Sequence, residues 1–197
     1  MLFQKKSGPI DWLVVGLGNP GMTYEGTRHN AGCSALAVLA KDAGVELDKK
    51  QFKGLTATAT VEGKKVLLLF PQTFMNNSGE AVQAAMAFYK LQPDQLLVLS
   101  DDITLDVGGV RVRKKGSDGG QKGLRDIIAH VGTEDFPRIR IGVGKKPHPA
   151  YDLVDWVLSK YKKEELPLME EAFEKAAAAA CLVVAGRIEE AMNKYSH

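Results

Sequence analysis

Cysteine is scarce in this sequence of 197 residues, and long apolar runs are missing. Only Cys33 and Cys181 are present, far apart and in apolar surroundings, so we expect two buried small side chains. No apolar run approaches the roughly 20 residues of a membrane span. No stretch long enough for the apolar part of a secretory signal follows the lysines near the N-terminus. We therefore expect a cytoplasmic protein without a membrane segment.

The overall composition is that of an ordinary globular protein. Apolar residues make up 45% and charged residues 25% of the chain, which excludes a disordered or fibrous protein. The length is enough for one compact domain with its own core. Neither a repeat nor a linker divides the sequence, so we expect a single domain over residues 1–197.

The net charge of +2 conceals an uneven distribution. Residues 111–146 hold ten Lys or Arg and four Asp or Glu, a balance of +6, and the remainder of the chain carries −4. A basic segment on a mildly acidic body is typical of a surface that binds a polyanion such as nucleic acid. The charges alone fit a solvated surface rich in Lys and Arg equally well.

Apolar periodicity predicts strands that alternate with helices. Strands are expected over residues 11–16, 52–61, 64–70, 95–99, 110–113 and 139–143. Helices are expected over residues 30–43, 77–89, 120–130 and 165–193. Asn77 and Glu80 have the spacing of a capping box at the start of the second helix. The alternation predicts an α/β fold with a twisted, mixed β-sheet flanked by helices.

A glycine pattern follows the first expected strand. Gly16, Gly18 and Gly21 have the G-x-G-x-x-G spacing of dinucleotide-binding proteins. In those proteins the third glycine lies in the first turn of a helix, where free N–H groups meet phosphate. Here the residues after Gly21 lack apolar periodicity, and the acid expected about 20 residues on would end a helix instead of a strand. We therefore exclude a dinucleotide site.

Polar side chains follow several of the expected strands. Asn19 follows the first strand, Asn76 follows the hairpin formed by the strands over residues 52–61 and 64–70, and Asp101 ends a central strand. Residues 27–30, with His29, stand at the start of the first helix. Ligands of open α/β sheets bind at the carboxyl ends of the strands, so we expect these side chains to converge there.

Four motifs in this order carry a specific resemblance: VVGLGNPGMTYEGTRHNAG, PQTFMNNSG, LLVLSDDITLDVGGVRVRKKGSDGGQKGL and FPRIRIGVGK. Together they resemble the bacterial-type peptidyl-tRNA hydrolase family. The resemblance extends from about residue 12 to residue 192, and the first two motifs are long and uncommon. It implies a monomeric α/β protein that hydrolyses the ester between a peptide and the 3′ ribose of tRNA, without cofactor or metal.

The resemblance also implies roles for individual side chains. His29 would be the general base, and Asp101 would be its partner. Asn19 would help to distinguish blocked from free aminoacyl groups, and Asn76 would position the substrate.

Three further residues are implied on the substrate side. Tyr24 and Phe74 would contact the 3′ terminal nucleotide and nearby substrate, with Met75 packed beside them.

The chemistry of these residue types agrees with the implied reaction. A neutral imidazole can take a proton from water, and a carboxylate on its other nitrogen fixes the tautomer. Asparagine amides can donate hydrogen bonds to a developing oxyanion. The sequence has no G-x-S-x-G nucleophile motif, so we expect direct attack by water. Asp101, Asp102 and Asp106 lack the spacing of metal ligands and are interpreted as a turn at a strand end.

One position departs from the family pattern. After GSDGG the family usually has His-Asn-Gly, whose asparagine contacts substrate, and this chain has Gln121-Lys122-Gly123. Lysine donates hydrogen bonds and adds a cation but cannot accept as an amide does. Contact between Lys122 and substrate is therefore a hypothesis.

The basic segment matches family positions that bind the 5′ phosphate and acceptor stem of tRNA. These positions are Arg113, with Lys114 and Lys115 beside it, and Arg140, and a further basic residue is expected at Lys145 or Lys146. Such contacts are independent of sequence and sensitive to salt.

Two other functions are compatible with parts of this pattern. A catalytically inactive RNA-binding protein on the same fold, like a chloroplast splicing factor related to the family, would have lost members of the catalytic set. A general esterase would not need the basic segment. The presence of Asn19, His29, Asn76 and Asp101 favours the hydrolase.

Overall fold

A computed structural model describes residues 9–196 of the chain. Its centre is a seven-stranded sheet in the order β2-β3-β4-β1-β5-β7-β6. The strands are β1 (Trp12–Gly16), β2 (Lys49–Gln51), β3 (Gly54–Val61), β4 (Lys64–Pro71), β5 (Leu96–Asp102), β6 (Val110–Arg113) and β7 (Arg138–Gly142). β4, β1, β5 and β7 run parallel, and the outer strands β2, β3 and β6 pair antiparallel. The expected α/β fold with a mixed sheet is confirmed.

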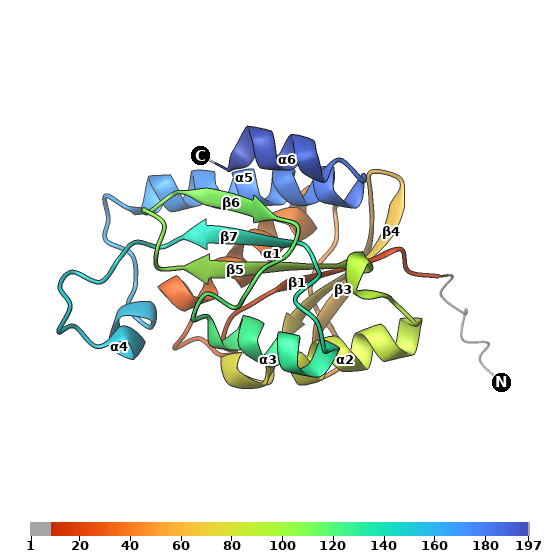
Figure 1. The fold of residues 1–197 in the computed structure, drawn as a ribbon, viewed down its shortest axis with the longest axis horizontal. Helices are drawn as coiled ribbons and strands as arrows, with labels where there is room; N and C mark the ends of the chain where they lie inside the picture. Colours follow the sequence, from red (N-terminus) through yellow and green to blue (C-terminus); the bar gives the residue numbers. More distant parts are fainter. Residues whose placement is uncertain (1–8, 197) are drawn as a thin grey trace.

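Helices cover both faces of the sheet (Figure 1). The helices are α1 (Ala31–Asp42), α2 (Ser78–Tyr89), α3 (Lys122–Val131), α4 (Leu153–Val157), α5 (Leu166–Val184) and α6 (Ile188–Tyr195). Short 3₁₀ turns are η1 (Arg28–Asn30), η2 (Met75–Asn77) and η3 (Pro93–Gln95). α1 and α5 pack with one face of the sheet in one apolar core, and α2 and α3 pack with the other face in a second core. α4 lies beyond the carboxyl ends of β5 and β7 (Figure 1).

The burial of each strand follows from its place between these layers. Residues 66–69 of β4 are all buried, because helices cover both sides of the sheet there. The outer strand β3 alternates between buried and exposed residues along its second half. Among residues 9–196, no helix is both long and apolar enough to cross a bilayer.

Two glycines of the first motif region let α1 lie against the sheet. A Cβ atom at Gly16 would come within 2.6 Å of Gly32 O and of Leu36 Cβ. A Cβ atom at Gly32 would come within 2.2 Å of Leu99 O. α1 begins only at Ala31, well after Gly21, as the sequence predicted. The glycines therefore allow close helix–strand packing.

Several local predictions were wrong. The expected helix over residues 165–193 is two helices, because Gly186 adopts a left-handed φ of 80° between α5 and α6. Asn77 makes no side-chain capping hydrogen bond, and Glu80 pairs with Lys53 instead. β2 and α4 were not predicted.

The two cysteines are free and partly exposed, whereas the sequence predicted buried side chains. Burial of the Cys33 thiol nevertheless raises its pKa to about 12, which makes it unreactive at neutral pH.

The C-terminal segment covers the edge of the sheet. β6 is the outermost strand beside β7. The N–H of Val112 in this strand donates to Ser196 Oγ at 2.9 Å, directly after α6.

Candidate active site

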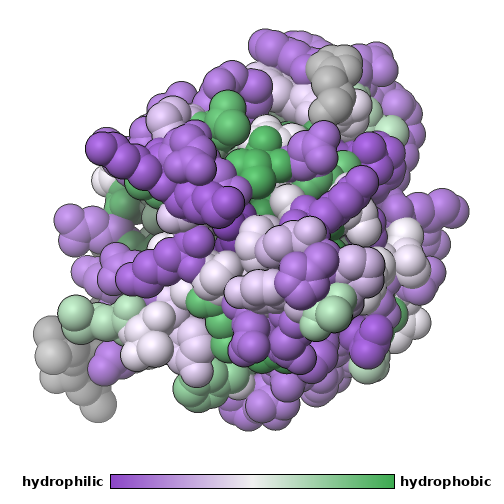
Figure 2. All heavy atoms as spheres, turned by 90° about the vertical axis from the view of Figure 1, so that its left-hand side faces the viewer, coloured by the Kyte–Doolittle hydropathy of each residue, from purple (hydrophilic) through white to green (hydrophobic). Residues whose placement is uncertain are grey.

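A cavity of about 530 Å³ opens at the carboxyl ends of the central strands. It is bordered by the loop after β1, by η2, by the end of β5, by the start of α3 and by α4. Figure 2 is viewed toward this edge of the sheet and shows hydrophobic residues exposed within a largely hydrophilic surface. The cavity brings together Asn19, His29, Phe74, Met75, Asn76, Asp101, Lys122 and Arg140 of the predicted site.

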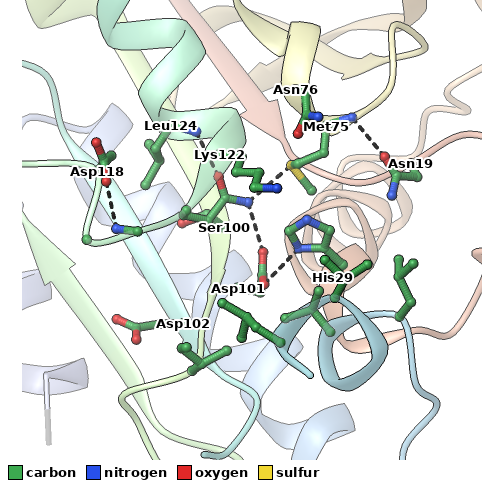
Figure 3. Close-up of a pocket in the computed structure, with 18 of the residues that line it drawn as sticks. Asn19, His29, Met75, Asn76, Ser100, Asp101, Asp102, Asp118, Lys122 and Leu124 are labelled. Atoms are coloured by element: carbon green, nitrogen blue, oxygen red, sulfur yellow. Dashed lines mark hydrogen bonds and ion pairs between the residues drawn. The ribbon is translucent and has the colours of Figure 1, made fainter. Parts of the chain in front are cut away.

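His29 and Asp101 form a hydrogen-bonded pair in this cavity (Figure 3). His29 Nδ1 lies 2.9 Å from Asp101 Oδ2, and the side chains are 13% and 3% exposed. His29 belongs to η1, and Asp101 is the next-to-last residue of the fully buried strand β5. Because an ionised carboxylate only accepts hydrogen bonds, Nδ1 carries the proton and Nε2 is left with a lone pair.

Asn19 connects the loop after β1 to η2. Its Oδ1 accepts a hydrogen bond of 2.7 Å from the N–H of Met75. Asn30 holds the Asn19 backbone in place, since its Oδ1 accepts from Asn19 N at 2.9 Å and its Nδ2 donates to Asn19 O at 3.0 Å. Asn19 lines the cavity, and within residues 9–196 its Nδ2 group makes no hydrogen bond.

The residues around η2 present side chains outward. Phe74 has a left-handed φ of 62° and a half-exposed ring. Tyr24 packs edge-to-face on this ring, with 6.2 Å between centroids. Tyr24 itself does not line the cavity. Asn76 is exposed at the cavity edge.

The start of α3 contributes a side chain that the predicted site lacked. Gln121 caps the helix through its Oε1, which accepts from Leu124 N at 2.7 Å. Its Nε2 donates to Asp101 Oδ1 at 3.0 Å. Lys122, the next residue, is exposed and lines the cavity. The departure from the family pattern was the only signal in the sequence for Gln121.

The basic residues of strands β6 and β7 differ in their surroundings. Arg138 is buried and donates to the carbonyls of Phe136, Ser117 and Glu134. Burial and the neighbouring Arg140 lower its pKa to about 10. Arg138 is thus a structural residue within the basic segment.

Other cations of the segment are more accessible. Arg140 Nη1 lies 3.5 Å from Asp102 Oδ2 at the cavity. Burial, together with Arg111 and Arg140, lowers the pKa of the Arg113 guanidinium on β6. Lys114 pairs with Glu189. Lys115 Nζ lies 3.6 Å from Asp135 Oδ1, and both of these side chains are exposed. Within residues 9–196, no ion pair involves Arg111, Arg113, Lys122, Lys145 or Lys146.

The acids beside the dyad form turns. Asp102 Oδ1 accepts from the N–H and hydroxyl of Thr104. In the described part of the chain, no three His, Cys, Asp or Glu side chains come close enough to hold a metal ion.

An apolar part of the cavity lining was not predicted. Leu153, Val154 and Val157 of α4 line the cavity, and the first two are nearly half-exposed. Arg28 anchors this part of the chain: its buried guanidinium stacks 3.8 Å from the Trp156 ring centroid and donates to Val143 O at 2.8 Å. A five-residue helix in a proline-containing segment gives almost no periodicity to detect.

Comparisons with known proteins agree on one family. Residues 13–197 match the family model described as peptidyl-tRNA hydrolase. A peptidyl-tRNA hydrolase of Lachnospira eligens is 47% identical over 185 residues, 94% of this chain and 99% of the relative. One of Caldicellulosiruptor bescii is 48% identical over 184 residues, 93% of this chain and 96% of the relative.

Solved structures agree as well. The crystal structure of peptidyl-tRNA hydrolase from Acinetobacter baumannii superposes with a TM-score of 0.89 at 36% identity, covering 96% of this chain and 97% of that one. The sequence motifs, the fold and these comparisons together show that the chain belongs to the peptidyl-tRNA hydrolase family.

Proposed function

We propose that this protein hydrolyses the ester bond between a peptide, or an N-blocked aminoacyl group, and the 3′ ribose of tRNA. The observation that carries the proposal is the 2.9 Å contact between His29 and Asp101 inside a cavity that also holds Asn19 and Asn76. Family membership supplies the substrate class.

His29 acts as the general base in this proposal. Its Nε2 lone pair takes a proton from a water molecule that attacks the ester carbonyl, and Asp101 stabilises the imidazolium as it forms. The proton then passes to the leaving 3′ oxygen of the ribose. Neither a metal nor a cofactor is needed for these steps.

Water attacks directly. Ser100 borders the cavity, but its Oγ has no hydrogen-bond partner within the described residues, so no base activates it as a nucleophile. Asn19 Nδ2 and the amide of Asn76 are the donors for the developing oxyanion and the substrate carbonyls. A donor of this kind contributes roughly 3 kcal/mol to transition-state stabilisation in comparable sites.

The RNA part of the substrate lies against the basic segment, residues 111–146. Arg113 and Arg140 contact phosphates of the acceptor stem, and Lys122 reaches the substrate from the start of α3. Tyr24 and Phe74 hold the 3′ CCA end through their rings, with Met75 behind them. Salt lowers the affinity of such phosphate contacts.

A catalytically inactive RNA-binding role is not favoured, because the catalytic set is complete and its members all line one cavity. These members are Asn19, His29, Asn76 and Asp101. A cytoplasmic location and a monomeric state remain predictions. Light scattering of the purified protein tests the latter.

The test is hydrolysis of N-acetyl-aminoacyl-tRNA and of unblocked aminoacyl-tRNA in the presence of EDTA, with His29→Ala alongside. We expect fast release from the blocked substrate only, and loss of release in the variant. Tight tRNA binding without any release by the wild-type protein would instead favour the RNA-binding role. Turnover of small esters without dependence on tRNA would indicate a general esterase.

A further inference from the structure

Gln121 occupies a central place in the hydrogen-bond network of the cavity. One hydrogen of its Nε2 group is donated to Asp101 Oδ1 at 3.0 Å, and Met75 Sδ lies 3.1 Å from the same nitrogen. Its Oε1 accepts from Leu124 N at 2.7 Å. The dashed lines at Asp101, Met75 and Leu124 in Figure 3 mark these contacts. Every polar group of this buried amide is thus engaged.

The orientation of this amide is fixed by its surroundings. The backbone N–H of Leu124 is only a donor, so Oε1 must face it. Nε2 therefore faces Asp101, whose carboxylate accepts from both sides: from Gln121 at Oδ1 and from His29 at Oδ2. Asp101 cannot rotate about its terminal torsion without breaking one of these two hydrogen bonds.

Close packing of α3 brings Gln121 within reach. A Cβ atom at Gly123 would lie 2.6 Å from Met75 Sδ and 3.0 Å from Leu17 Cδ1. Glycine at this position therefore lets the first turn of α3 lie directly against η2 and the loop after β1. The side chain of Gln121 therefore both caps α3 and holds the carboxylate of Asp101.

We propose that Gln121 is a positioning residue, whose amide holds the Asp101 carboxylate so that Oδ2 faces Nδ1 of His29. This inference rests on the proposed function, because it assigns Gln121 an effect on the general base. Gln121 acts through Asp101 and does not contact the reacting atoms. It also joins the dyad to Met75 and, through Met75, to Asn19.

Two substitutions separate this role from helix capping. Gln121→Ser keeps an oxygen that can cap Leu124 N, as serine does at helix starts, but its side chain is too short to reach Asp101. Gln121→Glu keeps the length and the capping oxygen and replaces the donor with a second carboxylate. Ile127→Val, in the buried face of α3, is the matched control for a weakened helix.

The measurement is kcat and KM for N-acetyl-aminoacyl-tRNA between pH 5 and 9, with a thermal unfolding curve for each variant. For Gln121→Ser we expect kcat to fall on the order of tenfold, a part of the roughly 10²- to 10⁴-fold that a general base contributes. KM and Tm should stay near the wild-type values.

Gln121→Glu should also move the acidic limb of kcat to higher pH, by on the order of one pH unit, because a nearby anion favours the charged imidazole. Other charged or titratable groups of the described residues around the cavity are unchanged in these variants, so the shift is assignable to position 121. These groups are Asp102, Asp118, Lys122, Arg140 and Tyr161.

The outcomes distinguish the two proposals. Wild-type kcat and an unmoved acidic limb in both Gln121 variants would overturn the positioning role while leaving the hydrolase intact. An equal loss of kcat in Ile127→Val would reduce Gln121 to a helix cap. Absence of hydrolysis by the wild-type protein would refute the proposed function itself.

Discussion

The side-chain oxygen of Asn19 accepts a 2.7 Å hydrogen bond from the backbone N–H of Met75, 56 residues further along the chain. This single contact ties the loop after β1 to η2, which presents Phe74 and Asn76. One side chain thus combines a structural acceptor with the Nδ2 group that we propose as a donor to the substrate. The two functions can be separated by mutation.

Asn19→Ala leaves the buried N–H of Met75 unpaired, so the free energy of unfolding should fall by about 1–3 kcal/mol. Asn19→Asp keeps the acceptor and removes the Nδ2 donor, so it should lose less stability. Both variants should lose kcat/KM for the blocked substrate by on the order of 10²-fold. Urea unfolding and steady-state kinetics provide the two readouts, and full activity of Asn19→Asp would eliminate Nδ2 as a substrate donor.

Lys122→Ala tests substrate contact at the start of α3. Lys122 is exposed, lines the cavity and has no ion pair within the described residues. We expect KM to rise a few-fold, on the order of 1 kcal/mol of lost binding, while kcat stays constant. Lys163→Ala, an exposed lysine outside the cavity, is the control. Unchanged KM in Lys122→Ala would remove Lys122 from the site.

Arg113→Ala should weaken binding of an acceptor-stem RNA without regard to its sequence. Loss of one phosphate contact should also reduce the slope of log affinity against log salt by about 1. Titrations at several salt concentrations measure both quantities. Arg187→Ala serves as control, because Arg187 lies in an exposed pair with Glu190 after α5. The same slope for Arg113→Ala and wild type would place the phosphates elsewhere.

Glu165 links pH to stability through Arg28. Burial alone would raise the pKa of Glu165, but its hydrogen bonds with Arg28 and with the N–H of Lys162 outweigh this and lower the pKa below the ordinary 4.5. A lowered pKa in the folded state means that the stabilisation is present above pH 4.5 and is lost as pH falls through the folded value.

Glu165→Gln should therefore reduce the free energy of unfolding by about 1–3 kcal/mol at pH 7. The difference from wild type should shrink in acid, below pH 4.5. Chemical denaturation at both pH values measures it. Glu190→Gln, in the exposed pair with Arg187, should cost about 0–1 kcal/mol at most. A difference that is constant with pH would show that the charge of Glu165 does not contribute.

The sequence predicted the architecture because its apolar periodicity is strong. The alternation of buried strands and helices follows from residues such as Ala35, Leu36 and Leu39, which repeat at helical spacing. Convergence at one cavity was predictable as well, because the carboxyl ends of parallel strands share an edge.

The errors have local physical causes. The alanine-rich segment favours a continuous helix by propensity, and only the left-handed conformation of Gly186 ends it. α4 is too short for its periodicity to be detected. The contact between Gln121 and Asp101 joins residues 20 positions apart and depends on how closely α3 packs, which no local pattern encodes.

The hydrogen bond from Val112 to Ser196 bears on how the protein behaves in concentrated solution. An outermost strand with free N–H and C=O groups can recruit a strand from another molecule and so initiate aggregation. Here the residue after α6 uses up one of those groups, and α6 packs beside β6. The C-terminal segment therefore occupies one of the positions at which a strand of another molecule could pair with β6. It does so from the side of the first core, and α6 contributes no residue to the cavity.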